Sequence, residues 1–160
     1  MLEGGFTGRV SAVNQAAAEA GQQVLGVPTY ASVTEVPEPV ALALVAVPAE
    51  RVMDVVDDCA AAAVAGMLVV SSGYAESGPD GVARQRQLVR RARGNGMRVI
   101  GPNAPGIVTT DPDVCLNASL APRAKSRAST SRIAPDFGAR TLWSWISFTG
   151  SSIRGPPCAR

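Results

Sequence analysis

A strand, a helix and a second strand are predicted over residues 40–76, and this stretch constrains the fold more than any other. Residues 42–47 are a continuous apolar run that ends at Pro48, after which apolar residues recur at helical spacing. We expect Gly66 to end that helix and residues 67–70 to form the second strand. Two all-apolar strands joined by an amphipathic helix are typical of a parallel sheet covered on both faces.

The flanking segments extend this α/β pattern. We expect a short strand over 9–13, a weak helical turn or loop over 15–23, an edge strand over 24–27, a capped helical turn over 32–36, a helix over 81–93 capped by Asp80, a strand over 98–100, and a loop with a short strand over 103–117. The predicted fold class is therefore α/β, a Rossmann-like, doubly wound parallel sheet.

The composition of the chain changes near Ala121. Residues 121–160 hold 7 of the 15 Lys+Arg but only 1 of the 13 Asp+Glu, so the net charge of +2 conceals −4 in residues 1–120 and +6 in the remainder. We predict one domain over 1–120, incomplete at its N-terminus, followed by an irregular basic tail over 121–160 that is disordered or frame-shifted. The acidic charge of the domain gives no reason to expect nucleic-acid binding.

Several classes of site are excluded by residues that the chain lacks. It has no histidine, so it cannot hold a Ser-His-Asp triad, a Cys-His dyad or a phosphohistidine, and we expect no metal site. The three cysteines, at 59, 115 and 158, lack zinc-ligand or redox spacing and suit a reducing cytoplasm. The longest uncharged apolar run, residues 59–70, is far shorter than the ~20 residues that span a bilayer. We expect a cytoplasmic protein without a signal peptide or membrane segment.

The ends of the predicted strands are the place to look for a binding site. The two central strands end in proline and in small residues, and both should end at the same edge of a parallel sheet. In open α/β sheets, ligands bind at the carboxyl edge of the strands. No G-x-G-x-x-G motif opens a helix here, which argues against a dinucleotide as the ligand.

Six segments, read in order, resemble a known family. They are VNQ (13–15), GVPTYASVTEVPEPVALALVAVPAE (26–50), SSGYAESG (71–78), RQRQLVRRAR (84–93), GMRVIGPNAPGIVTTDP (96–112) and LNASLAP (116–122). Together they resemble the CoA-binding domain of NDP-forming acyl-CoA synthetases, the relatives of the succinyl-CoA synthetase alpha subunit. The same domain occurs fused to an acetyltransferase domain in some bacterial proteins. The resemblance covers residues 4–122 and depends on the order of the motifs rather than on any one of them.

The resemblance implies that CoA or an acyl-CoA lies across the carboxyl edge of the sheet. Glycine and proline in the edge loops, including Gly101, would let adenine or pantetheine approach the backbone closely, and polar side chains would bind ribose or amide groups. No catalytic residue is implied. The cofactor-binding residues that the resemblance implies are Val13, Asn14, Val47, Pro48, Ala49, Ser72, Gly73, Tyr74, Glu76, Pro102 and Asn103.

The chain departs from the family pattern in three places. The usual first strand and its Gly-Ala-Ser phosphate loop are absent, and that strand would be central, next to residues 42–47. Gln15 and two alanines replace the proline and basic residue that usually follow Asn14. After Pro122 no second domain with a Gly-rich loop follows, which suggests the hypothesis that a shifted reading frame begins there and that the chain is a remnant of a longer enzyme.

Three functions remain open at this point. The first is CoA binding as the nucleotide-binding part of an NDP-forming acetate- or succinate-type acyl-CoA ligase, inactive alone because it would need an ATP-grasp (beta) subunit or domain. The second is the CoA-binding regulatory part of a protein acetyltransferase, and the third is a remnant that binds nothing. The arginines of residues 84–93 and the aspartates at 54, 57 and 58 are typical of solvated helix faces; binding of acidic partners is the alternative for the arginines.

Overall fold

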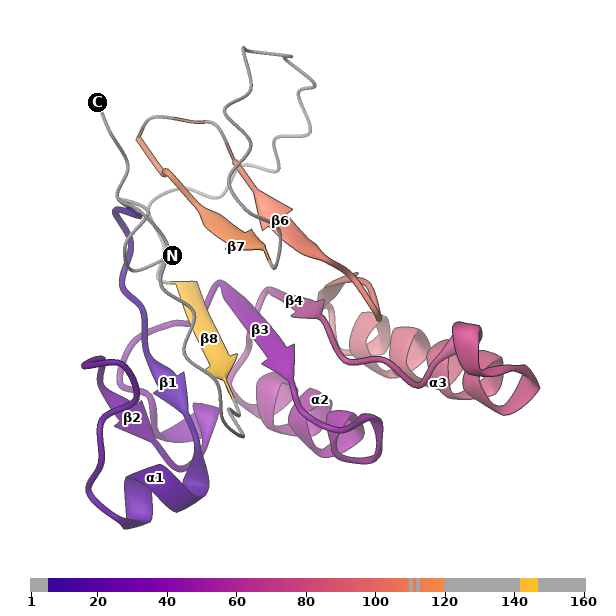
Figure 1. Cartoon of the computed structure of the whole chain (residues 1–160), viewed down its shortest axis with the longest axis horizontal. Coiled ribbons are helices and arrows are strands. Elements are labelled where there is room, and N and C mark those ends of the chain that lie inside the picture. Colours follow the sequence, from indigo (N-terminus) through magenta and orange to yellow (C-terminus); the bar gives the residue numbers. More distant parts are fainter. Residues whose placement is uncertain (1–5, 110, 112, 120–141, 147–160) are drawn as a thin grey trace.

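A parallel sheet forms the centre of the molecule (Figure 1). The computed structural model describes residues 6–109, 111, 113–119 and 142–146. All pairings in the six-stranded sheet are parallel. Across the sheet, the strand order is β2 (Thr29–Tyr30), β1 (Ala12–Val13), β8 (Leu142–Ile146), β3 (Leu42–Ala46), β4 (Gly66–Val69) and β5 (Arg98–Ile100).

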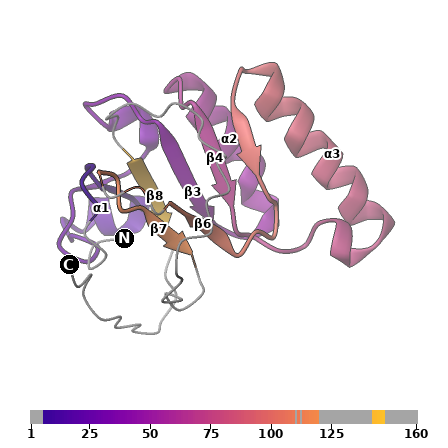
Figure 2. The same cartoon turned by 90° about the horizontal axis from the view of Figure 1, so that it is seen from above.

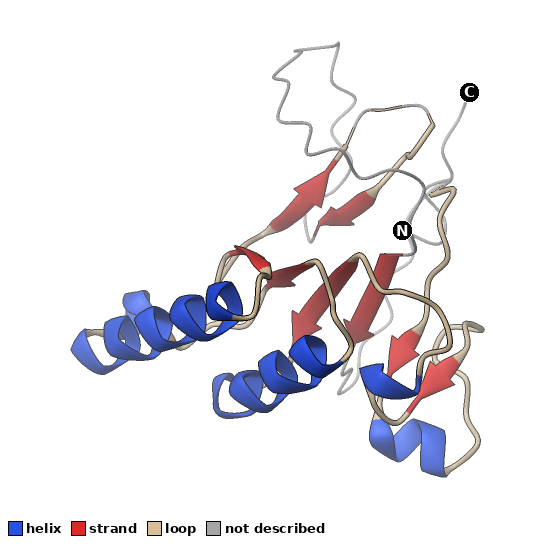
Figure 3. Ribbon diagram, turned by 180° about the vertical axis from the view of Figure 1, so that it is seen from behind, coloured by secondary structure: helices blue, strands red, loops and turns tan. Residues whose placement is uncertain are grey.

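Different layers cover the two faces of the sheet (Figure 2). Helices α2 (Val52–Ala61) and α3 (Pro79–Gly94) lie side by side on one face, as Figure 3 shows from behind. The antiparallel pair β6 (Gly106–Val108) and β7 (Asn117–Ser119) lies on the other. The short helices are α1 (Gln15–Glu19), η2 (Val33–Glu35), η3 (Ala49–Arg51) and η4 (Ala75–Ser77).

The apolar residues of the central strands divide between two cores. Ala43, Val45, Met67 and Val69 belong to the core beneath the helices, whereas Leu42 and Leu68 belong to the core beneath the β6–β7 pair. This alternation explains why both strands are apolar at nearly every position. Burial of each large side chain contributes about 1.5–3 kcal/mol. The predicted α/β, Rossmann-like parallel sheet is confirmed.

Cys59 lies in the helix-side core, where the sequence places it. The side chain is fully buried, and burial raises the pKa of the thiol to about 12. It is therefore a neutral packing residue at physiological pH.

Three predicted boundaries are wrong. Helix α2 ends at Ala61 rather than at Gly66, because Ala63 already has a positive φ and Gly66 begins β4. Helix α3 begins with Pro79 at its first position, so its cap is Gly78 and not Asp80. The strand expected over 24–27 is only an isolated bridge, and the paired strand β2 follows Pro28, whose carbonyl oxygen accepts a hydrogen bond from the Ala12 N–H.

The central position of the sheet is filled by a segment in which the sequence indicated no packed element. Strand β8 pairs with β3 over five residues and with β1 at Ala12. If β8 is counted as strand 1, the order β2-β1-β8-β3-β4-β5 reads 3-2-1-4-5-6, which is the Rossmann pattern, although β8 comes last in the chain. The rest of the predicted tail, including Cys158, lies outside the described residues, so the division at residue 120 stays a prediction.

Candidate functional site

Strands β3, β4 and β5 end at the same edge of the sheet, and residues at or next to their ends pair with one another. Val45 of β3 pairs with Val69 of β4, and Leu68 of β4 pairs with Ile100 of β5. Because the strands are parallel, the segments that follow them leave the sheet together. These segments contain most of the predicted site residues.

Asn14, which follows β1, lies at the same edge of the sheet but is farther from β3 than the loop after β4 is. Ala12 and Leu44 both pair with Ser144, so β1 lies two strand spacings, about 10 Å, from β3. The Asn14 side chain is the N-cap of α1, and its Oδ1 accepts a hydrogen bond of 2.9 Å from the Ala17 N–H. Its side-chain oxygen is therefore already used within the protein.

A buried serine joins the other three loops. The hydroxyl of Ser71, directly after β4, donates a hydrogen bond of 2.5 Å to the carbonyl oxygen of Val47, after β3. The carbonyl oxygen of Ser71 accepts one of 3.0 Å from the N–H of Asn103, after β5. Ser71 and Ser11 are the buried polar residues in the described part of the chain. Ser71 was not among the predicted site residues, although it is the first polar residue after an apolar strand.

The loop after Ser71 is held by a carboxylate. Oε1 of Glu76 accepts hydrogen bonds from the N–H of Gly73, at 2.6 Å, and from that of Tyr74, at 3.1 Å. These backbone donors lower the pKa of Glu76 below its ordinary value, the bond from Tyr74 having the largest effect. Arg84 of α3 donates a hydrogen bond to the Gly73 carbonyl oxygen. Oε1 of Glu76 therefore orders this loop, and contact between the exposed Glu76 side chain and a ligand stays a prediction.

Two glycines allow the loops to approach one another. Gly73 has a φ of +96°, and a Cβ there would lie 3.3 Å from the Cβ of Ala49. Gly101 has a φ of +97°, and a Cβ there would lie 2.4 Å from the carbonyl oxygen of Val69. The expectation that Pro48, Gly73 and Gly101 gather at one edge is therefore met in the geometry.

The predicted site residues differ in how far they can reach a ligand. Tyr74 is buried, with 1% of its surface exposed, and burial raises the pKa of its hydroxyl. Its side chain is therefore part of the helix-side core, beneath the loop. At this edge the exposed residues are Pro48, Ser72, Glu76 and Asn103. The partly exposed residues are Asn14, Gly73 and Pro102, and the buried ones are Val13, Val47 and Ala49.

No metal centre or membrane segment is seen in the part of the chain that the structure describes. There, His, Cys, Asp and Glu side chains form no group of three that could hold a metal ion. Nor, over the same residues, is any helix long and apolar enough to cross a membrane.

A parallel sheet with Rossmann strand order, and with linked loops along its carboxyl edge, defines a nucleotide-binding α/β domain. Residues 2–110 match the sequence model of the CoA binding domain. The chain therefore belongs to this family of CoA-binding domains, as its motifs indicated.

Known proteins with similar sequences are acid–CoA ligases. An ADP-forming acetate–CoA ligase I of Archaeoglobus fulgidus is 37% identical over 133 residues, which are 83% of this chain and 17% of that protein. The alpha subunit of ADP-forming acetate–CoA ligase I of Pyrococcus furiosus is 36% identical, over 76% of this chain and 26% of the subunit. The chain thus spans about a sixth to a quarter of the length of these relatives.

A solved structure shows the same relationship. The dinucleotide-forming acetyl-coenzyme A synthetase 1 of Candidatus Korarchaeum cryptofilum, in complex with phosphate and ADP, superposes with a TM-score of 0.67 and 38% identity. The match covers 76% of this chain and 24% of that one. Fold and sequence therefore agree on the family.

Proposed function

We propose that this chain binds CoA or an acyl-CoA across the loops that follow β3, β4 and β5. The observation that carries the proposal is the pair of hydrogen bonds at Ser71, which hold these three loops together. Loops fixed in advance lose little conformational entropy when a ligand binds, so more of the contact energy appears as affinity.

The exposed groups at this edge suit the parts of CoA. Ser72 and Asn103 are exposed and offer hydroxyl and amide groups to ribose hydroxyls or pantetheine amides. Gly73 exposes backbone without a side chain, which suits the close approach of a flat ring or an extended arm. Glu76 and Ser71 would act indirectly, by holding these groups in position.

We further propose that the chain corresponds to the nucleotide-binding part of an NDP-forming acyl-CoA ligase. The relatives that support this are acetate–CoA ligases several times longer than this chain. Because the chain has no histidine, the phosphohistidine step that the family resemblance implies would need another domain, and an ATP-grasp subunit or domain is the proposed partner. The isolated chain is expected to show no ligase turnover. The acetyltransferase alternative is not favoured, since these relatives are ligases.

Isothermal titration calorimetry with CoA tests the proposal. The full chain should bind CoA saturably, and Ser72→Ala and Asn103→Ala should each weaken binding by about three- to tenfold with an unchanged melting temperature. Ser77→Ala, an exposed serine in η4, is the matched control and should bind CoA like the wild type. If neither Ser72→Ala nor Asn103→Ala weakens CoA binding, the ligand binds elsewhere.

A further inference from the structure

The outer surface of the helix layer carries opposite charges on two adjacent helices. On α2, Asp54 and Asp57 are exposed and Asp58 is partly exposed; we call these three the acidic face. On α3, Arg86, Arg90 and Arg93 are exposed; we call these the basic face. The buried residues of each helix, such as Val55 and Val56 on α2 or Leu88 and Ala92 on α3, lie on its other side, toward the sheet.

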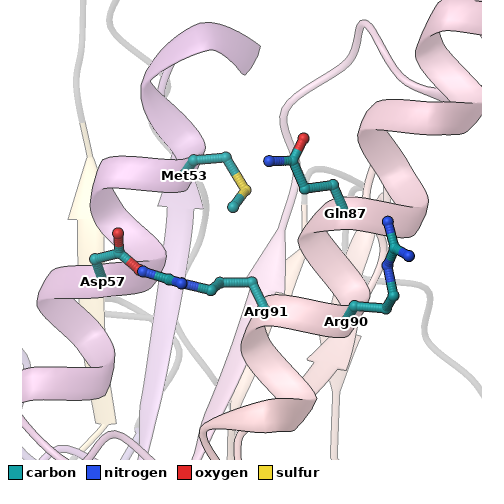
Figure 4. A pocket seen from close by; sticks show the side chains of 5 residues that line it. All are labelled: Met53, Asp57, Gln87, Arg90 and Arg91. Carbon is teal, nitrogen blue, oxygen red and sulfur yellow. The ribbon is translucent and has the colours of Figure 1, made fainter.

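A shallow groove of about 530 Å³ runs between the two helices (Figure 4). Across it, Nε of Arg91 donates a hydrogen bond of 2.7 Å to Oδ1 of Asp57. Figure 4 shows Gln87 directed toward Met53 and Arg90 turned away from Asp57. Among the described residues, no ion pair includes Arg86, Arg90 or Arg93. On the acidic face, Asp54 pairs with Arg51 at 3.1 Å and Asp57 pairs with Arg91 at 2.7 Å.

The distribution of charge indicates what would bind this surface. Six of the eight basic residues in positions 1–120 lie between 84 and 98, although this part of the chain has a net charge of −4. A partner for the basic face must carry negative charge, and a helix with three aspartates lies beside it. A surface with an acidic and a basic stripe of this kind is complementary to itself under a two-fold rotation.

We propose that the helix layer associates with the same layer of a second copy of this chain. A two-fold axis that runs parallel to the helices, between α2 and α3, sets the acidic face of each copy against the basic face of the other. Each dimer then contains two equivalent acidic–basic contacts. None of the residues proposed to contact CoA takes part, so the inference does not depend on the proposed function.

Association of this kind is weak and sensitive to salt. Exposed ion pairs each contribute little and are screened at high ionic strength. Charge complementarity mainly selects the partner and orients it. We expect the dissociation constant of the dimer to rise at least tenfold between about 50 mM and about 500 mM NaCl.

A charge-exchange experiment tests the proposal by analytical ultracentrifugation. One variant, R86E/R90E, replaces the basic face with acid; the other, D54K/D57K, replaces the acidic face with base. Each variant alone should be monomeric, because like charges then face each other in both contacts. An equimolar mixture should form a heterodimer, because both contacts become attractive again. R98E, which changes an exposed charge outside both faces, should dimerise like the wild type.

The outcomes separate this proposal from its alternatives. A wild-type chain that stays monomeric at about 50 mM NaCl would overturn it, as would a dimer that is insensitive to salt or a mixture that stays monomeric. Binding of an oligo-glutamate peptide or a DNA duplex by a monomeric wild type would also overturn it and would identify another kind of partner. Should either variant fail to fold by circular dichroism, the salt dependence of the wild type and the behaviour of the single variant D54K, which keeps the Asp57–Arg91 hydrogen bond, decide the question.

Discussion

The hydroxyl of Ser71 lies 2.5 Å from the carbonyl oxygen of Val47 and joins the end of β4 to the end of β3. This hydrogen bond is buried, and the carbonyl oxygen of Ser71 also accepts a hydrogen bond from the N–H of Asn103. One residue therefore fixes the relative positions of the three loops that we propose to bind CoA. The account of function depends on this link.

Replacing Ser71 with alanine should lower both stability and affinity for CoA. The carbonyl oxygen of Val47 would lose its buried donor, at a cost of about 1–3 kcal/mol in the free energy of unfolding. The melting temperature should fall by a few degrees, about 2–4 °C per kcal/mol for a chain of this size. Differential scanning calorimetry measures the first effect and calorimetric titration the second. Ser77→Ala removes an exposed hydroxyl instead, and a fall as large in that variant would contradict the role given to Ser71.

The loop over Gly73 and Tyr74 should lose its order in acid. The folded-state pKa of Glu76 is below its ordinary value of 4.5, so the ionised carboxylate stabilises the loop. That contribution is complete above pH of about 4.5 and disappears as the pH falls through the lowered folded-state value. The amide NMR signals of Gly73 and Tyr74 should move together over this range.

Glu76→Gln provides the control for the acid transition. The amide oxygen can still accept both hydrogen bonds but does not titrate, so the pH-dependent shifts of the two amide signals should vanish. Unchanged titration of Gly73 and Tyr74 in this variant would show that another group controls the loop.

Gly73→Ala should lower the free energy of unfolding more than Gly78→Ala does. Both glycines have a φ of +96°, which L side chains rarely adopt, so both substitutions carry a backbone cost of about 1–3 kcal/mol. At Gly73 the new methyl group would also crowd Ala49 at 3.3 Å, whereas at Gly78 no atom lies within 4 Å. Chemical denaturation of the two variants measures how much the crowding against Ala49 adds to the backbone cost. We expect reduced CoA affinity only in Gly73→Ala, and equal affinity in both variants would remove Ala49 and Gly73 from the site.

Strand β8 should be needed for cooperative folding. It joins β1 to β3, and no direct pairing between those two strands is found in the described part of the sheet. A chain that ends at residue 141 loses this strand, whereas one that ends at residue 147 keeps it. The shorter chain should lose its cooperative thermal transition, and the longer one should melt like the full chain. If both melt alike, β8 contributes nothing to the sheet.

The centre of the fold could be predicted because hydrophobic pattern alone determined it. The apolar run at 42–47 and the change to helical spacing after it could form little else than a strand and a crossover helix. Helix ends were harder, since Ala63 takes a positive φ that its residue type does not indicate. Strand β8 was not predicted because its segment shows no periodicity; only its pairing with β1 and β3 in the folded chain identifies it.

The sequence placed the candidate site residues at strand ends, whereas their roles toward CoA stay predictions. The strand ends placed Gly73 and Asn103 at one edge from the sequence alone. That Tyr74 is buried and that Glu76 binds backbone N–H groups follow from loop geometry, which no motif encodes. Ser71 joins three strand ends through tertiary hydrogen bonds; its place after an apolar run marks it as polar at a strand end, but only the folded chain shows these partners.

Ligand-specific thermal stabilisation of the full chain tests the central claim most directly. CoA, NAD and ATP are added separately at equal concentrations, and the melting temperature of the chain is measured for each. Because a ligand that binds only the folded state stabilises it by RT ln(1 + [L]/Kd), a CoA concentration of about 100 times Kd adds about 2.7 kcal/mol. We predict a rise with CoA that exceeds the rise with NAD or ATP and that is reduced in Ser71→Ala. A melting temperature unchanged by CoA, or raised equally by all three ligands, would contradict the account.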